Sequence, residues 1–295
     1  MNVTQAALKT LCAAAALVLA VPAVAQQGPV DTTPVTSGPL APTVVDDGSD
    51  NFTIGLGAGY APSYEGSDNY VISPAGLIRG RVSGFNFYSR ATALYVDVVR
   101  EAPGSDINIE VGPMANLRLD RNSRIRDARV SALGKINTAI EVGGFAGITK
   151  NKVFHGYDFL TLRLDVYHDV ASAHESTIFA PNIEYATPLS TSFLLGVSVS
   201  AEHVGDKFAR TYYSVSPTGA AASGLSPFNA EGGWKNVRGT LLATYSLSGD
   251  LRKGPAIFAV GSYSKLLGDF KRSPVVSQAG DRNQFFAALG LSYSF

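Results

Sequence analysis

The chain has 295 residues, of which 45% are hydrophobic and 16% are charged, and its 24 Lys and Arg residues are balanced by 24 Asp and Glu residues. This balance gives no electrostatic basis for binding nucleic acid. The single cysteine, Cys12, lies in the signal peptide predicted below, so the mature chain would form no disulfide and no thiolate-based metal site.

Residues 1–25 have the features of a secretory signal peptide. Lys9 is their only charged residue, residues 11–21 are apolar, and Ala23-Val24-Ala25 matches a cleavage site. The apolar run is shorter than the roughly 20 residues that a membrane-spanning helix needs. Because Cys12 lies at the start of this run and not after it, a lipoprotein signal is disfavoured. We therefore expect export and removal of residues 1–25.

Residues 26–50 have a different composition, in which prolines are interspersed with Thr, Ser and Gly and acidic residues follow. These residues are Pro29, Pro34, Pro39, Pro42, Asp46, Asp47 and Asp50. The segment lacks periodic apolar positions, which predicts a disordered tail. Since it precedes the first predicted strand, it would lie in the periplasm, either as a spacer or as a docking segment for a partner.

Beyond residue 50, short segments alternate between apolar residues and small or polar ones. No run approaches 18 consecutive apolar residues, which excludes a helical membrane protein. Segments of about ten alternating residues are typical of an outer-membrane barrel. Their polar positions are mostly Gly, Ser, Thr and Asn, whereas the wet face of a soluble sandwich would carry many Lys and Glu residues. The 13 Tyr and 15 Phe residues, several at strand ends, suit aromatic girdles.

The last segment, residues 283–295, shows this alternation most clearly. Phe285, Leu289, Leu291, Tyr293 and Phe295 all fall on one face of a strand, with small or polar residues between most of them. A strand of this kind that ends on Phe resembles the signal recognised by the barrel insertion machinery of the outer membrane. We assign that role to Leu291, Tyr293 and Phe295, and expect this strand to pair with the first one and close the barrel.

The fold predicted is an all-β, transmembrane, antiparallel up-and-down β-barrel spanning residues 51–295. Eleven candidate strands are visible: 52–61, 70–82, 85–99, 107–118, 139–149, 158–170, 176–187, 192–203, 234–247, 255–265 and 283–295. A closed antiparallel barrel with both ends in the periplasm needs an even number. We predict twelve, with 85–99 divided around Arg90-Ala91, and keep ten as the alternative. Segments 187–190 and 248–254 suit periplasmic turns, and 204–233 and 266–282 suit extracellular loops.

Seven charged residues on the predicted strands would face the barrel interior, because charge is costly towards lipid. They are Glu110, Arg118, Glu141, Arg163, Asp165, Glu202 and Arg238. They would either fill the barrel as an ion-pair network or line a narrow aqueous path.

The sequence contains no recognisable catalytic motif. The four histidines, His155, His168, His174 and His203, are interpreted as surface or loop residues, because neighbours in a strand point to opposite faces and no G-x-S-x-G motif occurs. Glu65 and Asp68 could hold a cation, but no further acidic ligands accompany them. We predict a protein that is not an enzyme and has no cofactor and no metal site.

Three stretches resemble motifs of one family. They are Gly55–Tyr60 followed by Pro62-Ser63-Tyr64-Glu65-Gly66-Ser67-Asp68, then Tyr212-Tyr213-Ser214-Val215-Ser216, and finally Leu266–Asp269 followed by Ser273-Pro274-Val275-Val276. In this order they resemble the MipA/OmpV family, the MltA-interacting-protein family of outer-membrane proteins, over about 52–295. Ser214 stands where the family usually has Gly, which puts the geometry of one turn in question. The motif residues singled out are Pro62, Tyr64, Glu65, Gly66, Ser67, Asp68, Tyr212, Tyr213, Val215, Ser273 and Pro274.

The resemblance implies a location in the outer membrane of a Gram-negative bacterium. It also implies a non-catalytic scaffold that links a murein transglycosylase to a peptidoglycan synthase, through the tail and the periplasmic turns. The alternatives are a channel for small solutes, favoured by the inward charges and long loops, and a surface adhesin, which would use the loops at 204–233 and 266–282.

Overall fold

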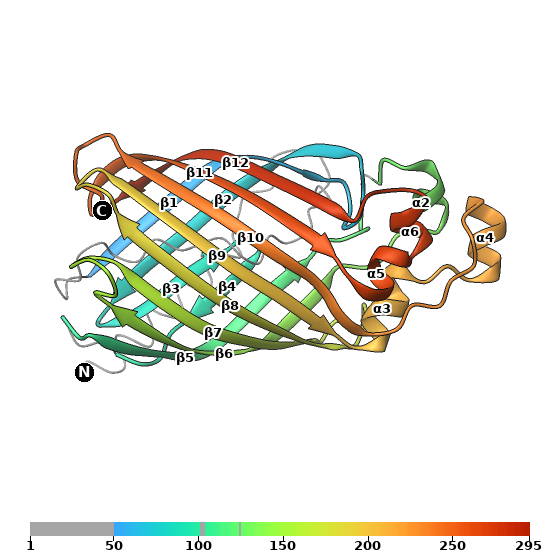
Figure 1. Ribbon diagram of the computed structural model, residues 1–295, viewed down its shortest axis with the longest axis horizontal. Coiled ribbons are helices and arrows are strands. Elements are labelled where there is room, and N and C mark those ends of the chain that lie inside the picture. Colours follow the sequence, from blue (N-terminus) through green and yellow to red (C-terminus); the bar gives the residue numbers. More distant parts are fainter. Residues whose placement is uncertain (1–49, 101–103, 124) are drawn as a thin grey trace, which may run out of the picture.

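The structure is a computed structural model that describes residues 50–100, 104–123 and 125–295 (Figure 1). The predicted signal peptide, residues 1–25, and all but the last residue of the predicted tail, residues 26–50, lie outside the described residues. No helix in the described part of the chain is long and apolar enough to cross a membrane.

Twelve antiparallel strands form one closed barrel, in which each strand pairs with its neighbours in the chain and β12 pairs with β1. The strands are β1 (Asn51–Pro62), β2 (Tyr70–Val82), β3 (Phe85–Arg90), β4 (Ala93–Val96), β5 (Ile107–Arg118), β6 (Ala139–Asn151), β7 (Phe159–Asp169), β8 (Thr177–Pro188), β9 (Phe193–Val204), β10 (Gly233–Ser246), β11 (Gly254–Leu266) and β12 (Asn283–Ser294). The predicted fold class is therefore confirmed, with twelve strands and not ten.

The candidate strand 85–99 is a short hairpin, β3 and β4, whose turn is Ala91-Thr92. The division falls at Arg90-Ala91, as predicted, and Ala91 adopts a positive φ of 50°. The extra strand makes the count even, which returns the end of β12 to the end of the barrel where β1 begins (Figure 1).

β12 closes the barrel through the predicted pairing with β1. Thr53 lies opposite Ser294, and the Phe295 N–H donates a hydrogen bond of 2.8 Å to the Phe52 carbonyl. Leu291, Tyr293 and Phe295 point outwards and are exposed, with the small residues of β12 between them facing the interior. The alternation read from the sequence is thus an outward apolar face and an inward small or polar face.

The connections differ greatly between the two ends of the barrel. All the helices of the described residues lie at the end opposite the C-terminus (Figure 1). They are α2 (Ala128–Ala132), α3 (Asp206–Tyr213), α4 (Pro217–Ser223), α5 (Gly268–Arg272) and α6 (Pro274–Ser277). Outer-membrane barrels have short periplasmic turns and long extracellular loops, so this helical end is the extracellular one.

Outward aromatic rings gather at both ends of the strands. Tyr60 stacks on Tyr70 at the extracellular end, with ring centroids 4.9 Å apart. At the periplasmic end, Phe52 lies 6.2 Å from Phe87 and 6.0 Å from Phe295. Rings at these two levels form the girdles expected where a barrel meets the membrane interfaces.

Candidate functional site

Five extracellular loops, which we call the cap, close the outer end of the barrel. They comprise residues 63–69, 119–138, 170–176, 205–232 and 267–282. The three motifs recognised in the sequence meet in this cap, although they lie far apart along the chain. Their contacts with one another and with the strands define the candidate site.

The first motif loop is tied to the last extracellular loop. The Tyr64 hydroxyl donates to the Ala279 carbonyl at 2.7 Å, and Ser67 forms an isolated β-bridge with Gly280. Gly66 has a positive φ (+99°), and its carbonyl accepts from the Asp281 N–H. From Pro62 to Ser67 the loop is buried, and Asp68 and Asn69 reach solvent. This stretch is a structural element of the cap and not an exposed binding loop.

The second motif forms the end of α3 and the extended segment after it. Tyr212 and Tyr213 are almost fully buried, and Val215 pairs with Phe228 in an isolated bridge. Ser214 has φ −80° and ψ 149°, an extended conformation that any residue adopts. The absence of Gly at this position therefore has no conformational cost.

The third motif holds the second in place. The Ser273 hydroxyl donates to the Tyr213 carbonyl at 2.5 Å and also accepts from the Val275 N–H at the start of α6. Pro274 follows as the first residue of that helix and is buried. Ser273 thus connects α3 to α6, which joins the cap loops 205–232 and 267–282.

A buried cation fastens the cap to the barrel. Lys235 Nζ lies 2.8 Å from Glu65 in the first motif loop and 2.7 Å from Glu202 on β9, and its side chain is only 1% exposed. Asn236 donates a further hydrogen bond to Glu65 at 3.2 Å. The Lys235 ammonium also lies over the Phe208 ring of α3, 5.1 Å from its centre. One side chain therefore joins two strands and two cap loops.

Lys235 points inwards because β10 contains an irregularity at that position. The register with β9 shifts between Trp234 and Asn236, and both Lys235 and Asn236 are buried whereas Trp234 is exposed. A β-bulge breaks the two-residue alternation, so two successive side chains can face the same side. The alternation rule consequently gave no signal for Lys235, which was missed in the sequence.

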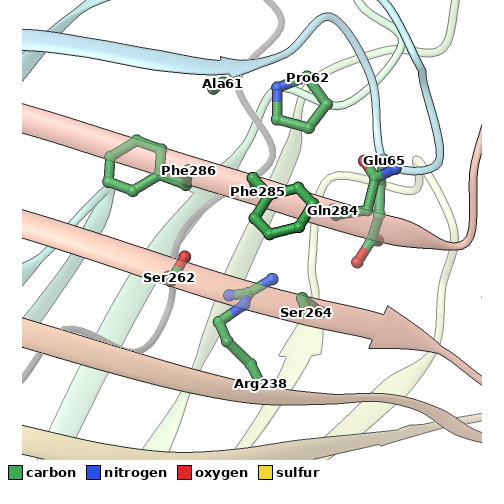
Figure 2. A pocket seen from close by; sticks show the side chains of 9 residues that line it. All are labelled: Ala61, Pro62, Glu65, Arg238, Ser262, Ser264, Gln284, Phe285 and Phe286. Atoms are coloured by element: carbon green, nitrogen blue, oxygen red, sulfur yellow. The ribbon is translucent and has the colours of Figure 1, made fainter.

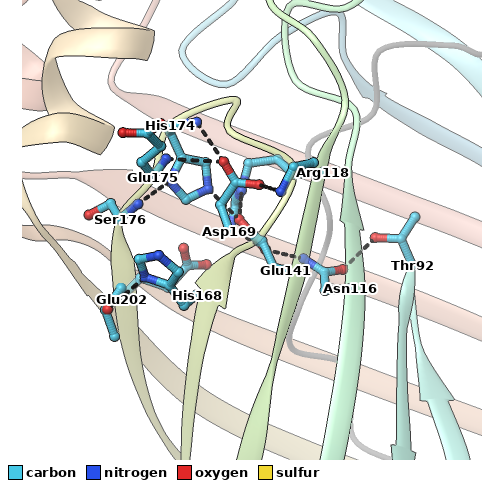
Figure 3. Close-up of polar contacts among 12 residues, drawn as sticks. Thr92, Asn116, Arg118, Glu141, His168, Asp169, His174, Glu175, Ser176 and Glu202 are labelled. Atoms are coloured by element: carbon cyan, nitrogen blue, oxygen red, sulfur yellow. Dashed lines mark hydrogen bonds and ion pairs between the residues drawn. The ribbon is translucent and has the colours of Figure 1, made fainter.

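A second buried cluster lies around Glu141 on β6 (Figure 3). Its carboxylate accepts from Arg118 Nε and Asn116 Nδ2, each at 2.6 Å, and from His174 Nε2 at 2.9 Å. His174 Nδ1 accepts from the Ser176 N–H, so the proton is on Nε2 and the ring is the neutral tautomer. His174 belongs to the loop 170–176, as predicted for a loop residue, but it is buried and not at the surface.

A third network fills the barrel below the cap. Arg163 pairs with Asp165 at 2.8 Å, and Asp165 also accepts from the Tyr95 hydroxyl at 2.9 Å. Arg90 on β3 pairs with Glu184 on β8 at 2.7 Å, across the interior. The bonds from Tyr95 to Asp165 and from Arg90 to Glu184 each connect two strands that are not neighbours, so they occupy space that an open pore would need.

The seven charged residues predicted to face inwards do so. Glu110 is half-buried and the other six are buried: Arg118, Glu141, Arg163, Asp165, Glu202 and Arg238. The sequence left two alternatives, an ion-pair network or the lining of an aqueous path. Most of these seven residues belong to an ion-pair network. Four further charged residues of the same interior are not apparent from the sequence: Lys235, Arg90, Glu184 and Asp120.

Along β1 the inward residues are small, namely Gly55, Gly57, Gly59 and Ala61, and β10–β12 add Ser and Ala residues together with Phe258 and Phe286. A pocket lies beneath the cap there, between the β11–β12 wall and the first motif loop (Figure 2). It is lined by Ala61, Pro62, Glu65, Arg238, Ser262, Ser264, Gln284, Phe285 and Phe286. Two charged side chains, Glu65 and Arg238, face this pocket among hydroxyl and aromatic groups (Figure 2).

Asp120, in the β5–β6 loop, accepts from the Glu65 N–H at 2.9 Å. Burial, followed by repulsion from Glu65, raises the pKa of this carboxyl from 3.8 to about 6. The native cap therefore favours the protonated acid. The stabilising contribution of this group is complete below pH 3.8, the pKa in the unfolded chain, and is lost as the pH rises through about 6.

As the pH rises from 4 to 6, the free energy of unfolding should fall less for the Asp120→Asn variant than for the unmodified protein. The reason is that the amide keeps an acceptor oxygen for the Glu65 N–H and cannot ionise. The difference should be on the order of 1–3 kcal/mol at neutral pH. The measurement is the unfolding free energy at several pH values in lipid vesicles. Parallel pH profiles for the two proteins would contradict this assignment.

Nothing in the described residues forms a cluster of three or more His, Cys, Asp or Glu side chains suited to a metal ion. Glu65 and Asp68, which the sequence suggested as two ligands for one cation, lie in different environments. Glu65 is buried against Lys235, and Asp68 is exposed. The Glu65 carboxylate is therefore engaged by an ammonium group and an amide.

Comparison with solved structures finds outer-membrane barrels at low identity. An outer membrane channel from Pseudomonas putida F1 is 11% identical, with a TM-score of 0.43 and coverage of 92% of this chain and 100% of that chain. OprD from Pseudomonas aeruginosa is 13% identical, with a TM-score of 0.35 and coverage of 88% and 73%. These scores are too low to bear on function. No curated protein matches the sequence.

Comparison with protein families gives a match over residues 54–295, nearly the whole barrel, to the family described as MltA-interacting protein MipA. The match contains all three cap motifs and the closing strand, and it agrees with the resemblance seen in the sequence. Together with the closed twelve-stranded barrel, it assigns the protein to the outer membrane of a Gram-negative bacterium. The chain belongs to the MipA family.

Proposed function

We propose that this protein is a non-catalytic scaffold of the outer membrane that holds murein-synthesising and murein-remodelling enzymes at the periplasmic face. The family description names an interaction with MltA, a murein transglycosylase. The described structure adds an independent reason to prefer a scaffold to a pore, namely the way in which the outer end of the barrel is closed.

The packing of the cap into the barrel mouth is the observation that carries the proposal. Phe208, Tyr212 and Tyr213 of α3 belong to the same buried hydrophobic cluster as Tyr95 and Phe145 on the barrel strands. Ordered cores of this kind are packed about as densely as organic crystals. A solute arriving from outside would therefore meet a packed interior, reinforced by the Lys235 and Glu141 clusters.

A scaffold acts by raising the local concentration of its partners. Binding two enzymes to one barrel makes their encounter effectively intramolecular, provided that the connecting segments can span the distance. The predicted tail, residues 26–50, precedes β1, so in this proposal it supplies the contact on the periplasmic side together with the short turns. The barrel fixes that contact at the inner surface of the outer membrane.

Two measurements on the full mature protein test the proposal. In planar bilayers we expect no reproducible open-channel steps, and in cells we expect cross-links between residues 26–50 and a murein transglycosylase. Replacing residues 26–50 with a Gly/Ser segment of equal length should abolish the cross-links and leave barrel folding intact, as judged by heat-modifiable migration. Regular single-channel steps, or unchanged capture after the replacement, would refute the scaffold.

The second candidate is a channel for small solutes, and one observation favours it. The pocket under the cap lies beside the wall of small residues, and Arg238 and Glu65 face it (Figure 2). In this alternative the cap must move for solute to pass. Conductance that appears only when the contacts of Lys235 are removed would support a gated channel.

A further inference from the structure

The barrel wall is incomplete next to β2. β2 has 13 residues, but the neighbouring hairpin strands β3 and β4 have only 6 and 4. Among the described residues, the pairing of β2 with β3 runs only from Arg79–Tyr88 to Val82–Phe85. The other edge of β2 is paired with β1 along nearly its whole length. The extracellular half of β2, residues 70–77, therefore extends beyond the hairpin.

The backbone groups that face this gap can be identified. The Ile78 N–H donates to Ser89 Oγ on β3 at 2.9 Å, so at Ile78 the backbone is directed towards the hairpin. Every second residue of a strand directs its backbone groups to the same neighbour. Gly76, Pro74 and Ile72 therefore face the gap. Pro74 has no N–H, which suits a position where no strand lies alongside.

The gap has a defined border. Below it is the exposed hairpin tip, Ala91. On the far side is β5, which pairs with β4 from Ala93–Asn116 downwards and ends at Arg118. Above it, the loops that follow β1 and β5 are joined by the hydrogen bond from the Glu65 N–H to Asp120. The result is a window in the wall and not a frayed end of the barrel.

The outside of the window faces hydrocarbon. The outward side chains around it are large and apolar: Ile72 is 71% exposed, Leu56 73% and Leu117 44%. They continue the lipid-facing belt of the barrel without interruption. Unpaired backbone is costly in lipid and is tolerated where it borders a cavity inside the protein.

Inside the barrel, the β2 side of the window is mostly apolar. Ala75 and Leu77 of β2 point inwards and are half-buried, next to the small residue Gly55. On the opposite wall, Arg163 and Asp165 are buried in their ion pair. The surface behind the window is therefore apolar along Val71, Ala75 and Leu77 of β2, with Ser73 among them and the Arg90–Glu184 ion pair at its lower border.

We propose that this window is a lateral opening to the outer leaflet and that it holds an acyl chain of an outer-leaflet lipid. The chain lies over Pro74 and Gly76 and reaches Leu77 inside the barrel. Its chemistry fits both sides, because the lipid-facing belt is apolar and the inward residues Val71, Ala75 and Leu77 are apolar too.

Quenching by lipid tests the proposal. In a Trp234→Phe background, which removes the single native tryptophan, Leu77→Trp is compared with Val260→Trp in vesicles whose lipids carry bromine on the acyl chains. Val260 also points inwards and is half-buried, but β11 is paired on both sides. We expect severalfold stronger quenching at position 77. Equal quenching at the two positions would overturn the proposal.

A second measurement needs no tryptophan and applies if those variants fail to fold. Gly76 and Gly239 are both exposed glycines in strands, but Gly239 has strand partners on both sides. The Gly76 amide should exchange its hydrogen about 100-fold faster or more, because it lacks a strand partner. Equal protection of the two amides would show that the window is closed.

Discussion

Replacing Lys235 with Met is expected to lower the free energy of unfolding by about 3–5 kcal/mol, because it leaves buried carboxylates without their cation. Lys235 is the common partner of Glu65 and Glu202, and all three side chains are at most 5% exposed. The cap should be destabilised first, because Glu65 belongs to a loop that closes the outer end of the barrel. We therefore expect the cap to open before the barrel unfolds.

The measurement is chemical unfolding in lipid vesicles followed by circular dichroism. Lys265→Met is the matched control, because Lys265 is also on a strand near the extracellular end but is exposed. Adding Glu65→Gln to the Lys235→Met variant should recover part of the loss, since it removes one of the two uncompensated charges. Equal stability of the Lys235→Met and Lys265→Met variants would contradict the assigned role.

The second large effect is expected for Glu141→Leu, with a loss of about 3–5 kcal/mol for the same physical reason. Here the buried charge left without its partner is Arg118, whose side chain is 1% exposed and whose Nε lies 2.6 Å from Glu141. Asn116 and His174 would lose an acceptor at the same time. The loop 170–176 should become less ordered, because His174 holds it against β6.

Glu141→Gln separates charge from hydrogen bonding, since the amide keeps one acceptor oxygen for Arg118. Its stability should lie between those of Glu141→Leu and the unmodified protein. Glu231→Leu, at an exposed cap position, serves as the control for the loss of a glutamate. A Glu141→Leu variant as stable as this control would show that the Arg118 guanidinium finds solvent or another partner.

The strands could be predicted because their signal is local and repeated. A lipid-spanning strand has hydrocarbon on one side and the interior on the other, so its alternation is visible in about ten consecutive residues. The bounds of β2 and β5 agree with the predicted segments 70–82 and 107–118, and the closure of β12 on β1 followed from an even strand count.

The interior could be predicted only in part. Charged residues at inward positions, such as Arg118 and Glu141, were identified because charge is excluded from the lipid face. Their partners were not, since pairing depends on which strands face each other across the barrel. Lys235 was missed because a bulge reverses its direction, and the burial of His174 depends on α3 packing over it.

The amino-acid pattern was thus sufficient to predict the class of fold, the membrane-facing surface and the family, because each of these can be recognised in short stretches of sequence. Only the tertiary structure decided that the three motifs contribute to one cap, that a single ammonium group fastens it, and that, among the described residues, the β3–β4 hairpin pairs with only part of β2. These features arise from contacts between residues 170 or 215 positions apart, such as Glu65 with Lys235 and Tyr64 with Ala279. Local alternation does not encode such contacts, since their energy depends on burial and charge pairing that exist only after the barrel has closed.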